Sequence, residues 1–104
     1  MKRFRLSKAA ENDLRRIWRE GKQEHGEARA EMYLHALDQC FQLLADHPGM
    51  GHYFEGPRPL YRCFPKGAHN IYYRLEQDGI FVVRVRPQRM LPRKGMIDDE
   101  GARP

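Results

Sequence analysis

Residues 61–86, YRCFPKGAHNIYYRLEQDGIFVVRVR, decide the fold, because three strand-like runs are separated there by two turn signals. The runs are rich in aromatic and β-branched residues, which favour strands. They are residues 61–64, 68–75 and 80–86. The chain turns at 65–67, and again at 76–79, where an Asp-Gly pair is typical of a hairpin. The stretch therefore predicts a three-stranded antiparallel meander that ends at Pro87.

Side chains in a strand alternate between the two faces of a sheet, so the residue pattern predicts which side chains share a face. In the last strand, Phe81, Val83 and Val85 are expected on one face, and Ile80, Val82, Arg84 and Arg86 on the other. In the strand before it, Ile71, Tyr73 and Leu75 are expected opposite Asn70, Tyr72 and Arg74.

Arginines recur on these strands and directly after them, and we expect them to gather on the uncovered face of the sheet. The guanidinium fork suits carboxylate and phosphate oxygens, so this platform is the candidate surface for binding a partner. Its residues are Arg62, Arg74, Arg84, Arg86, Arg89 and Arg93. The alternative is an ordinary solvated sheet face.

The charge of the chain favours the binding interpretation, because the positive charge is segregated. The net charge of the whole chain is +5, whereas residues 1–56 are neutral overall and residues 57–94 carry +7. Segregated positive charge attracts nucleic acid or an acidic protein segment. A basic surface that serves only solubility is the competing interpretation.

Two amphipathic helices are predicted before the meander, over about residues 8–24 and 27–46. Ser7 is the expected N-cap of the first helix, because its hydroxyl can accept an unpaired backbone N–H. Gly26 suits the end of that helix, and the His-Pro-Gly at 47–49 stops the second. Two long helices with a tight connection predict an antiparallel hairpin.

The remaining segments complete the order β-α-α-β-β-β. Residues 3–6 alternate and predict a short strand that can join the sheet, while the glycines and prolines of 47–60 predict an ordered loop without a strand. The predicted class is α+β, a long antiparallel helix hairpin packed on a small antiparallel sheet. We expect one domain over residues 1–94 and a flexible tail over 95–104.

The 104 residues can bury only one modest core, which excludes a large enzyme with a separate cofactor domain. The mean hydropathy is −0.84. No stretch approaches the about 18 consecutive apolar residues of a membrane span. The first six residues lack the apolar run of a secretory signal. We therefore expect a cytoplasmic protein without a membrane partner.

Residues able to carry catalysis are sparse and fall in no recognised spacing. Ser7 is the only serine, and its capping role accounts for it. Cys40 and Cys63 are isolated and are expected to be small core residues. The five histidines form no H-x-x-x-H pair, so no metal site is expected, and His69 is expected to be a hydrogen-bonded surface residue. We predict no catalytic residue and no cofactor.

Four segments resemble, in order, the ParE branch of the RelE/ParE toxins of bacterial toxin–antitoxin systems. They are FRLSKAAENDLRRIW at 4–18, GEARAEMYLHALDQCFQLLADHPGMG at 26–51, RPLYRCFPKGAHNIYYRL at 58–75 and GIFVVRVRPQRM at 79–90. Each piece alone is weak, whereas the pieces in this order and with these lengths are specific. The resemblance covers roughly residues 3–93.

The resemblance implies a toxin that forms a hetero-oligomer with a small cognate antitoxin of the ParD type. Such antitoxins often have an acidic tail, which agrees with the segregated basic charge. ParE members are described as poisons of DNA gyrase, so the resemblance implies a gyrase inhibitor with no chemistry of its own. The six arginines named above are then the expected contacts to the target or the antitoxin.

RelE members of the same superfamily instead cleave mRNA on the ribosome, which needs groups that transfer protons. The family's ribonucleases often carry a Tyr or His near the C-terminus, and here none follows Tyr73. The long helix hairpin also favours ParE, and a RelE-like endoribonuclease is the alternative. One departure is Pro87, where many relatives carry His, so reduced toxicity or an altered target stays open.

Overall fold

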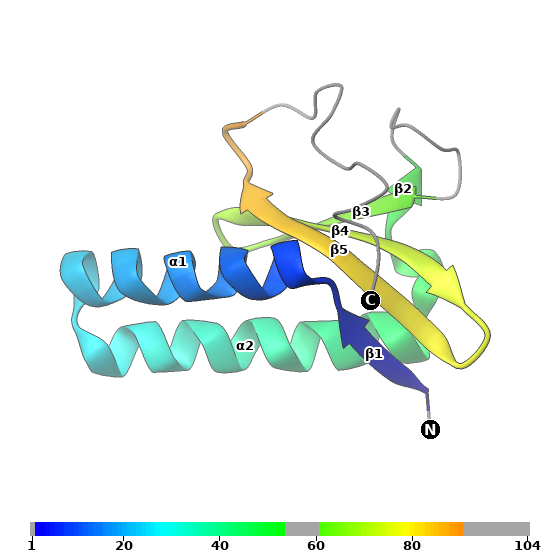
Figure 1. The fold of residues 1–104 in the computed structure, drawn as a ribbon, viewed down its shortest axis with the longest axis horizontal. Helices are drawn as coiled ribbons and strands as arrows, with labels where there is room; N and C mark the ends of the chain where they lie inside the picture. The colour runs from blue at the N-terminus through cyan, green and yellow to red at the C-terminus, as the bar shows by residue number, and fades with distance from the viewer. Residues whose placement is uncertain (1, 54–60, 91–104) are drawn as a thin grey trace.

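The computed structural model describes residues 2–53 and 61–90, in which two helices pack against one five-stranded sheet (Figure 1). The helices are α1 (Lys8–His25) and α2 (Glu27–Asp46), followed by the 3-10 turn η1 (Pro48–Met50). The strands are β1 (Arg3–Leu6), β2 (His52–Tyr53), β3 (Tyr61–Lys66), β4 (His69–Glu76) and β5 (Gly79–Pro87). The predicted α+β class is confirmed. The predicted tail, 95–104, lies outside the described residues, so the domain boundary stays a prediction.

The helical hairpin follows from the residues that cap α1. The Ser7 hydroxyl accepts the Ala10 N–H at 2.9 Å and donates to the Val83 carbonyl at 2.7 Å, which confirms the predicted N-cap. Gly26 has a φ of +87°, a left-handed conformation that suits glycine, and its N–H bonds the carbonyl of Lys22 at 3.0 Å. Neither α1 nor α2 is long and apolar enough to cross a membrane.

The sheet has the strand order β1-β5-β4-β3-β2 and is mixed. Strands β2 to β5 are antiparallel, as the meander predicts, whereas β1 runs parallel to β5 with Phe4 opposite Ile80. The expectation of a purely antiparallel sheet is therefore wrong for β1. Local alternation identifies this segment as a strand, but its partner and direction depend on the path of the whole chain.

The prediction that residues 47–60 contain no strand is wrong, because β2 pairs with β3. The hydroxyl of Tyr73 holds this segment: it accepts the Gly51 N–H at 2.9 Å and donates to the Pro48 carbonyl at 2.7 Å. A Cβ at Gly51 would collide with that hydroxyl, so glycine is required there. This long-range contact draws the loop to the sheet edge. Residues 54–60 lie outside the described part of the chain.

The main core lies between the helical hairpin and one face of the sheet. The helix side chains Leu37 and Phe41 are at most 1% exposed. They belong to the same cluster as Tyr73 of the sheet, which is completely buried. The sheet contributes Ile71, Tyr73, Ile80, Val82 and Val85 to this cluster. Burial of side chains of this size stabilises the fold by about 1.5–3 kcal/mol each. Cys40 belongs to the same core, as predicted.

A bulge in β5 changes the predicted faces. Tyr72 pairs with Arg84 and Tyr73 with Val82, so Val83 is an extra residue with no partner on β4. Phe81 and Val83 therefore lie with Tyr61, Cys63 and Tyr72 on the second face of the sheet, while Val85 returns to the helix side.

The prediction that Val85 shares a face with Phe81 and Val83 is thus wrong, as is the grouping of Ile80 and Val82 with the arginines. Phe81 and Val83 are completely buried, so the second face carries an apolar cluster of its own. The extra residue shifts the phase of alternation, which a strictly two-residue pattern cannot anticipate.

Candidate functional site

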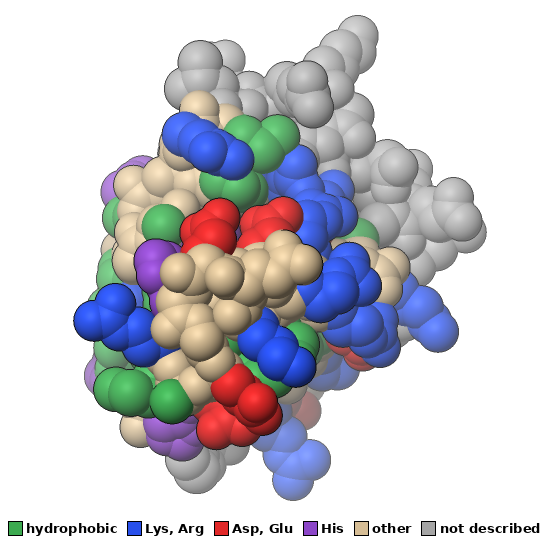
Figure 2. Space-filling view, turned by 90° about the vertical axis from the view of Figure 1, so that its left-hand side faces the viewer, with side chains coloured by type: hydrophobic (Ala, Val, Ile, Leu, Met, Phe, Trp, Pro, Cys, Tyr) green, Lys and Arg blue, Asp and Glu red, His purple; other side chains and the backbone are tan. Residues whose placement is uncertain are grey.

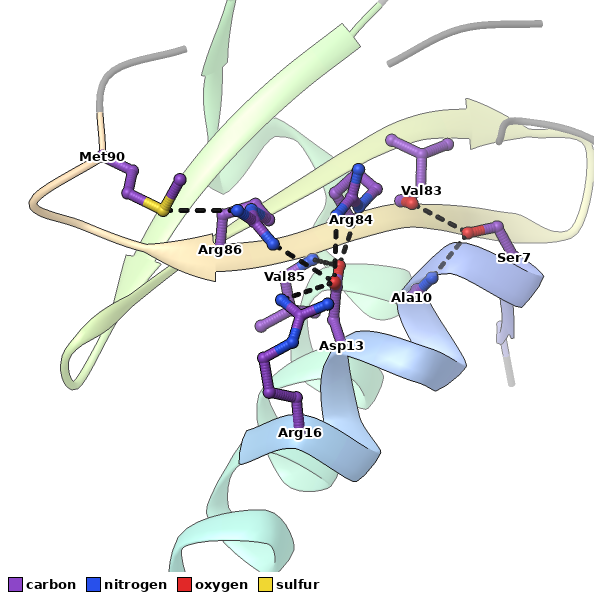
Figure 3. A network of polar contacts seen from close by, with 9 residues as sticks. All are labelled: Ser7, Ala10, Asp13, Arg16, Val83, Arg84, Val85, Arg86 and Met90. Carbon is purple, nitrogen blue, oxygen red and sulfur yellow. Dashed lines mark hydrogen bonds and ion pairs between the residues drawn. The ribbon is translucent and has the colours of Figure 1, made fainter. Parts of the chain in front are cut away.

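Helix α1 lies along the part of β5 that β1 leaves unpaired, because the pairing of β1 with β5 ends where Leu6 meets Val82. Beyond that point, polar groups of α1 and its cap bond the free edge of β5. The Ser7 N–H donates to the Val82 carbonyl at 2.9 Å. Nearly two turns further along α1, Asp13 Oδ2 accepts the N–H of Val85 at 2.9 Å (Figure 3). This part of the edge of β5 is therefore satisfied by the Ser7 backbone and the Asp13 side chain rather than by another strand.

Asp13 is the centre of this contact and is only 1% exposed. Arg84 binds it in a bidentate pair, with Nε 2.8 Å from Oδ2 and Nη2 3.0 Å from Oδ1. A buried carboxylate is costly without such partners, and charge-assisted bidentate bonds are among the strongest available. An aspartate of an amphipathic helix is ordinarily solvated, whereas Asp13 is buried. Its spacing from Ala10 and Ile17, three and four residues, is the signal that it lies on the buried stripe.

Two further arginines approach the same carboxylate. Nη1 of Arg86 lies 3.6 Å from Asp13 Oδ1, and Nη1 of Arg16 lies 3.7 Å from it. We call Asp13, Arg16, Arg84 and Arg86 the Asp13 cluster. Three guanidinium groups around one carboxylate leave the cluster with a surplus of positive charge. Figure 2 looks at the end of the hairpin where α1 connects to α2. On that face the larger group of Lys and Arg side chains lies on the right of the view.

Arg74 and Arg5 form a second basic group on the second face of the sheet. Their guanidinium carbons lie 4.8 Å and 4.6 Å from the centre of the Phe81 ring, within range for cation–π attraction. Arg5 also binds Glu76 with two hydrogen bonds of 2.9 and 2.5 Å, which lower the pKa of the Glu76 carboxyl. In the described residues Arg74 makes no hydrogen bond or ion pair.

The expectation that the arginines of the strands share one face is wrong for Arg62. It pairs in register with Tyr73, whose side chain lies on the helix side, so Arg62 points away from Arg74. Its guanidinium donates to the Gly51 carbonyl at 2.7 Å and lies 4.2 Å from the centre of the Tyr53 ring. Arg62 therefore supports β2 rather than the platform.

Of the last two predicted site residues, the structure describes Arg89 but not Arg93. Arg89 is exposed after the end of β5, and in the described residues no ion pair involves it. Arg93 lies outside the described residues. Arg84 and Arg86 are the predicted residues that the structure brings together, on the side of β5 opposite Val85 (Figure 3).

A pair that sequence reasoning missed lies where α2 meets the turn between β3 and β4. The Tyr33 hydroxyl is 2.6 Å from Nδ1 of His69 and accepts the Ala68 N–H at 3.1 Å. Both rings line a largely apolar groove of about 520 Å³ between the helices and this turn. Burial lowers the pKa of His69, which favours the neutral imidazole. No residue spacing connects positions 33 and 69, so only the fold reveals the pair.

The other residue types considered from sequence offer little chemistry. Burial raises the pKa of both Cys40 and Cys63, which disfavours the thiolate that a nucleophile requires. Within residues 2–53 and 61–90, no three His, Cys, Asp or Glu side chains lie close enough together to hold a metal ion.

Comparison with known proteins places this architecture in a family. Residues 4–92 match the family model described as the ParE toxin of the type II toxin–antitoxin system parDE. Toxin ParE1 of Caulobacter vibrioides is 37% identical over 90 residues, which cover 86% of this chain and 93% of that protein. Toxin ParE1 of Mycobacterium tuberculosis is 38% identical over 89 residues, 85% of this chain and 91% of that protein.

Solved structures agree in fold. A chain of the chromosomal ParDE toxin–antitoxin system from P. aeruginosa superposes with a TM-score of 0.69 at 16% identity, covering 84% of this chain and 96% of that one. The protein HP0894 from Helicobacter pylori superposes with a TM-score of 0.54 at 19% identity, covering 88% and 100%. The sequence match over nearly the whole chain, together with this fold, shows that the chain belongs to the ParE toxin family of type II toxin–antitoxin systems.

Proposed function

We propose that this toxin inhibits DNA gyrase in the cytoplasm and is neutralised in a hetero-oligomer with a cognate ParD-type antitoxin. The observation that carries the proposal is the composition of its basic surface. The side chains gathered at the edge of β5 are guanidinium groups around one carboxylate. A guanidinium stays charged and does not exchange protons at physiological pH, so such a surface favours binding of an anionic partner over acid–base catalysis.

The same surface supports an acidic antitoxin segment as the second partner. Arginine forks match carboxylates in geometry and charge. The surplus positive charge of the Asp13 cluster and the stacked Arg74 both lie on described, folded elements, which gives a disordered acidic tail a fixed surface to fold against.

The test is expression of the toxin alone and with its neighbouring gene, with growth, a DNA-damage reporter and transcript integrity measured together. The proposal expects growth arrest with DNA damage and intact mRNA, relieved by co-expression of the antitoxin. Purified gyrase should then accumulate cleaved DNA when the toxin is added. Arrest without DNA damage, or gyrase that is indifferent to the purified toxin, contradicts the gyrase assignment.

A matched pair of variants tests whether the arginines bind the target. Arg89→Glu reverses an exposed charge three residues after Arg86 and should reduce toxicity about tenfold or more, because the target surface is then repelled. Arg19→Glu makes the same change on the exposed side of α1 and serves as the control. Equal toxicity of the two variants removes Arg89 from the target surface.

The Tyr33–His69 pair favours one alternative function, a RelE-like endoribonuclease. A neutral imidazole bonded to a tyrosine hydroxyl in a groove is a chemically competent acid–base pair. His69→Asn and Tyr33→Phe would then each abolish mRNA cleavage while leaving the fold intact. Under the gyrase proposal, the same variants keep their toxicity, because neither side chain performs chemistry.

A further inference from the structure

We propose that Arg86, flanked by Arg16 and Arg84, binds a single carboxylate supplied by an acidic protein segment. This deepens the proposed function by naming the residue and the chemical group through which an acidic partner is held. The identity of that partner as the antitoxin rests on the proposed function, whereas the site itself rests on the geometry below.

Asp13 already accepts three hydrogen bonds, none of them from Arg86 or Arg16. Its Oδ2 accepts Arg84 Nε and the Val85 N–H, and its Oδ1 accepts Arg84 Nη2. Arg86 and Arg16 stand at 3.6 and 3.7 Å from Oδ1, beyond hydrogen-bond length. Asp13 thus attracts these two guanidinium groups without satisfying their N–H donors.

Arg86 is largely buried, yet few of its N–H donors have acceptors among the described residues. Its side chain is only 15% exposed. In the described residues the one acceptor within hydrogen-bond distance is the Met90 sulfur, 3.3 Å from Nη2. A thioether is a weak acceptor, so among the described residues Arg86 has the ion pair with Asp13 but no oxygen at hydrogen-bond distance, which is costly for a largely buried cation. An incoming oxyanion would supply the missing acceptor and offset the surplus positive charge.

The surroundings favour a carboxylate of a polypeptide over a phosphate of nucleic acid. Arg86 is recessed, so the ligand must reach inward on a flexible stem, which a Glu or Asp side chain provides and a duplex backbone does not. The apolar groove begins nearby: Ile17 follows Arg16 on α1, and His69 pairs with Pro87, the residue after Arg86. A recessed cation beside an apolar groove fits a segment with both acidic and apolar side chains.

Arginine-selective NMR of the full toxin tests the site, because each guanidinium Nε–Hε gives its own signal. We titrate hexaglutamate and, separately, a single-stranded thymidylate hexamer at equal ionic strength. Hexaglutamate should shift the Arg86 signal saturably and bind at least about tenfold more tightly than the oligonucleotide. Arg86→Gln should weaken hexaglutamate binding about tenfold. Arg19→Gln, the same change at an exposed position of α1, should leave it unchanged.

Three results overturn the proposal. They are an Arg86 signal indifferent to hexaglutamate, tighter binding of the oligonucleotide, and equal weakening in the two variants. If Arg86→Gln does not fold, Arg86→Lys takes its place, since it keeps the charge and loses the fork. Toxicity and rescue by the neighbouring gene are scored separately, so failure of the carboxylate site is distinguishable from failure of the gyrase proposal.

Discussion

Arg84 and Arg74 are directly comparable, since both extend from the central strands toward the second face of the sheet, yet they are held by different forces. Arg84 forms two short hydrogen bonds to a buried carboxylate. Arg74 lies over the Phe81 ring and, in the described residues, has no hydrogen-bonded partner. The comparison teaches that arginines which look alike in the sequence divide into one that is bound into the fold and one that, among residues 2–53 and 61–90, donates no hydrogen bond.

The largest expected effect on stability comes from removing Asp13, the carboxylate that holds Arg84. Asp13→Ala removes the acceptor of Arg84 and of the Val85 N–H, leaving a charge and a strand-edge donor unsatisfied. We expect the free energy of unfolding to fall by about 3–5 kcal/mol, measured by urea denaturation. A loss below about 1 kcal/mol would mean that water satisfies both groups and that Asp13 is not a structural centre.

A smaller effect is expected when the arginine rather than the carboxylate is removed. Arg84→Gln loses the bidentate pair, but Asp13 keeps the Val85 N–H and the nearby charges of Arg16 and Arg86. The expected loss of unfolding free energy is about 2 kcal/mol by the same measurement. If Arg84→Gln costs as much as Asp13→Ala, the flanking arginines do not compensate the carboxylate.

Acid unfolding tests the ion pair of Arg5 with Glu76, since Arg5 shares the Phe81 ring with Arg74. The Arg5 hydrogen bonds lower the pKa of Glu76 in the folded state, so the unfolded chain takes up this proton more readily. The pair therefore contributes stability above the ordinary pKa of 4.5 and loses it as the pH falls through the folded-state pKa. Glu76→Gln should flatten the stability profile below pH 4.5, by less than about 1 kcal/mol because Arg5 is exposed. If stability below pH 4.5 depends on pH equally in Glu76→Gln and in the unchanged protein, the Arg5–Glu76 pair does not contribute to stability.

The smallest effect on stability is expected at Arg74 itself. Arg74→Gln loses one cation–π contact and no hydrogen bond within the described residues. The free energy of unfolding should therefore fall by about 0.5 kcal/mol or less. Its effect should appear in partner binding instead, measured with the purified antitoxin by calorimetry. A stability loss equal to that of Arg84→Gln would erase the distinction between the two arginines.

Most of the fold could be predicted from sequence because its signals are local. Ser7 at the N-cap, Gly26 between the helices and the Asp-Gly turn at 78–79 each specify a conformation through their own chemistry. What sequence patterns could not supply were the long-range contacts. The hydrogen bonds of Tyr73 that place β2, and the pairing direction of β1, depend on residues far apart in the chain.

The candidate site was predicted only in part, for a similar reason. Arg84 and Arg86 were identified as a pair from their spacing, but the residue that organises them, Asp13, is 71 positions from Arg84 in the chain. An aspartate on a helix is usually solvated, and only its place on the apolar stripe argues for burial. Arg62 was misplaced because the register between β3 and β4 decides its face.

The bulge in β5 has a consequence for the length of this strand. Val83 is the one extra residue that the bulge accommodates, so only an alternation counted along the sequence falls out of phase after it. Without it the strand would alternate uninterrupted from Ile80 and still deliver Val85 to the helices and the two arginines to the opposite side. A chain shortened by this one residue would therefore keep the same assignment of side chains to faces, because the bulge already absorbs Val83 outside the pairing with β4.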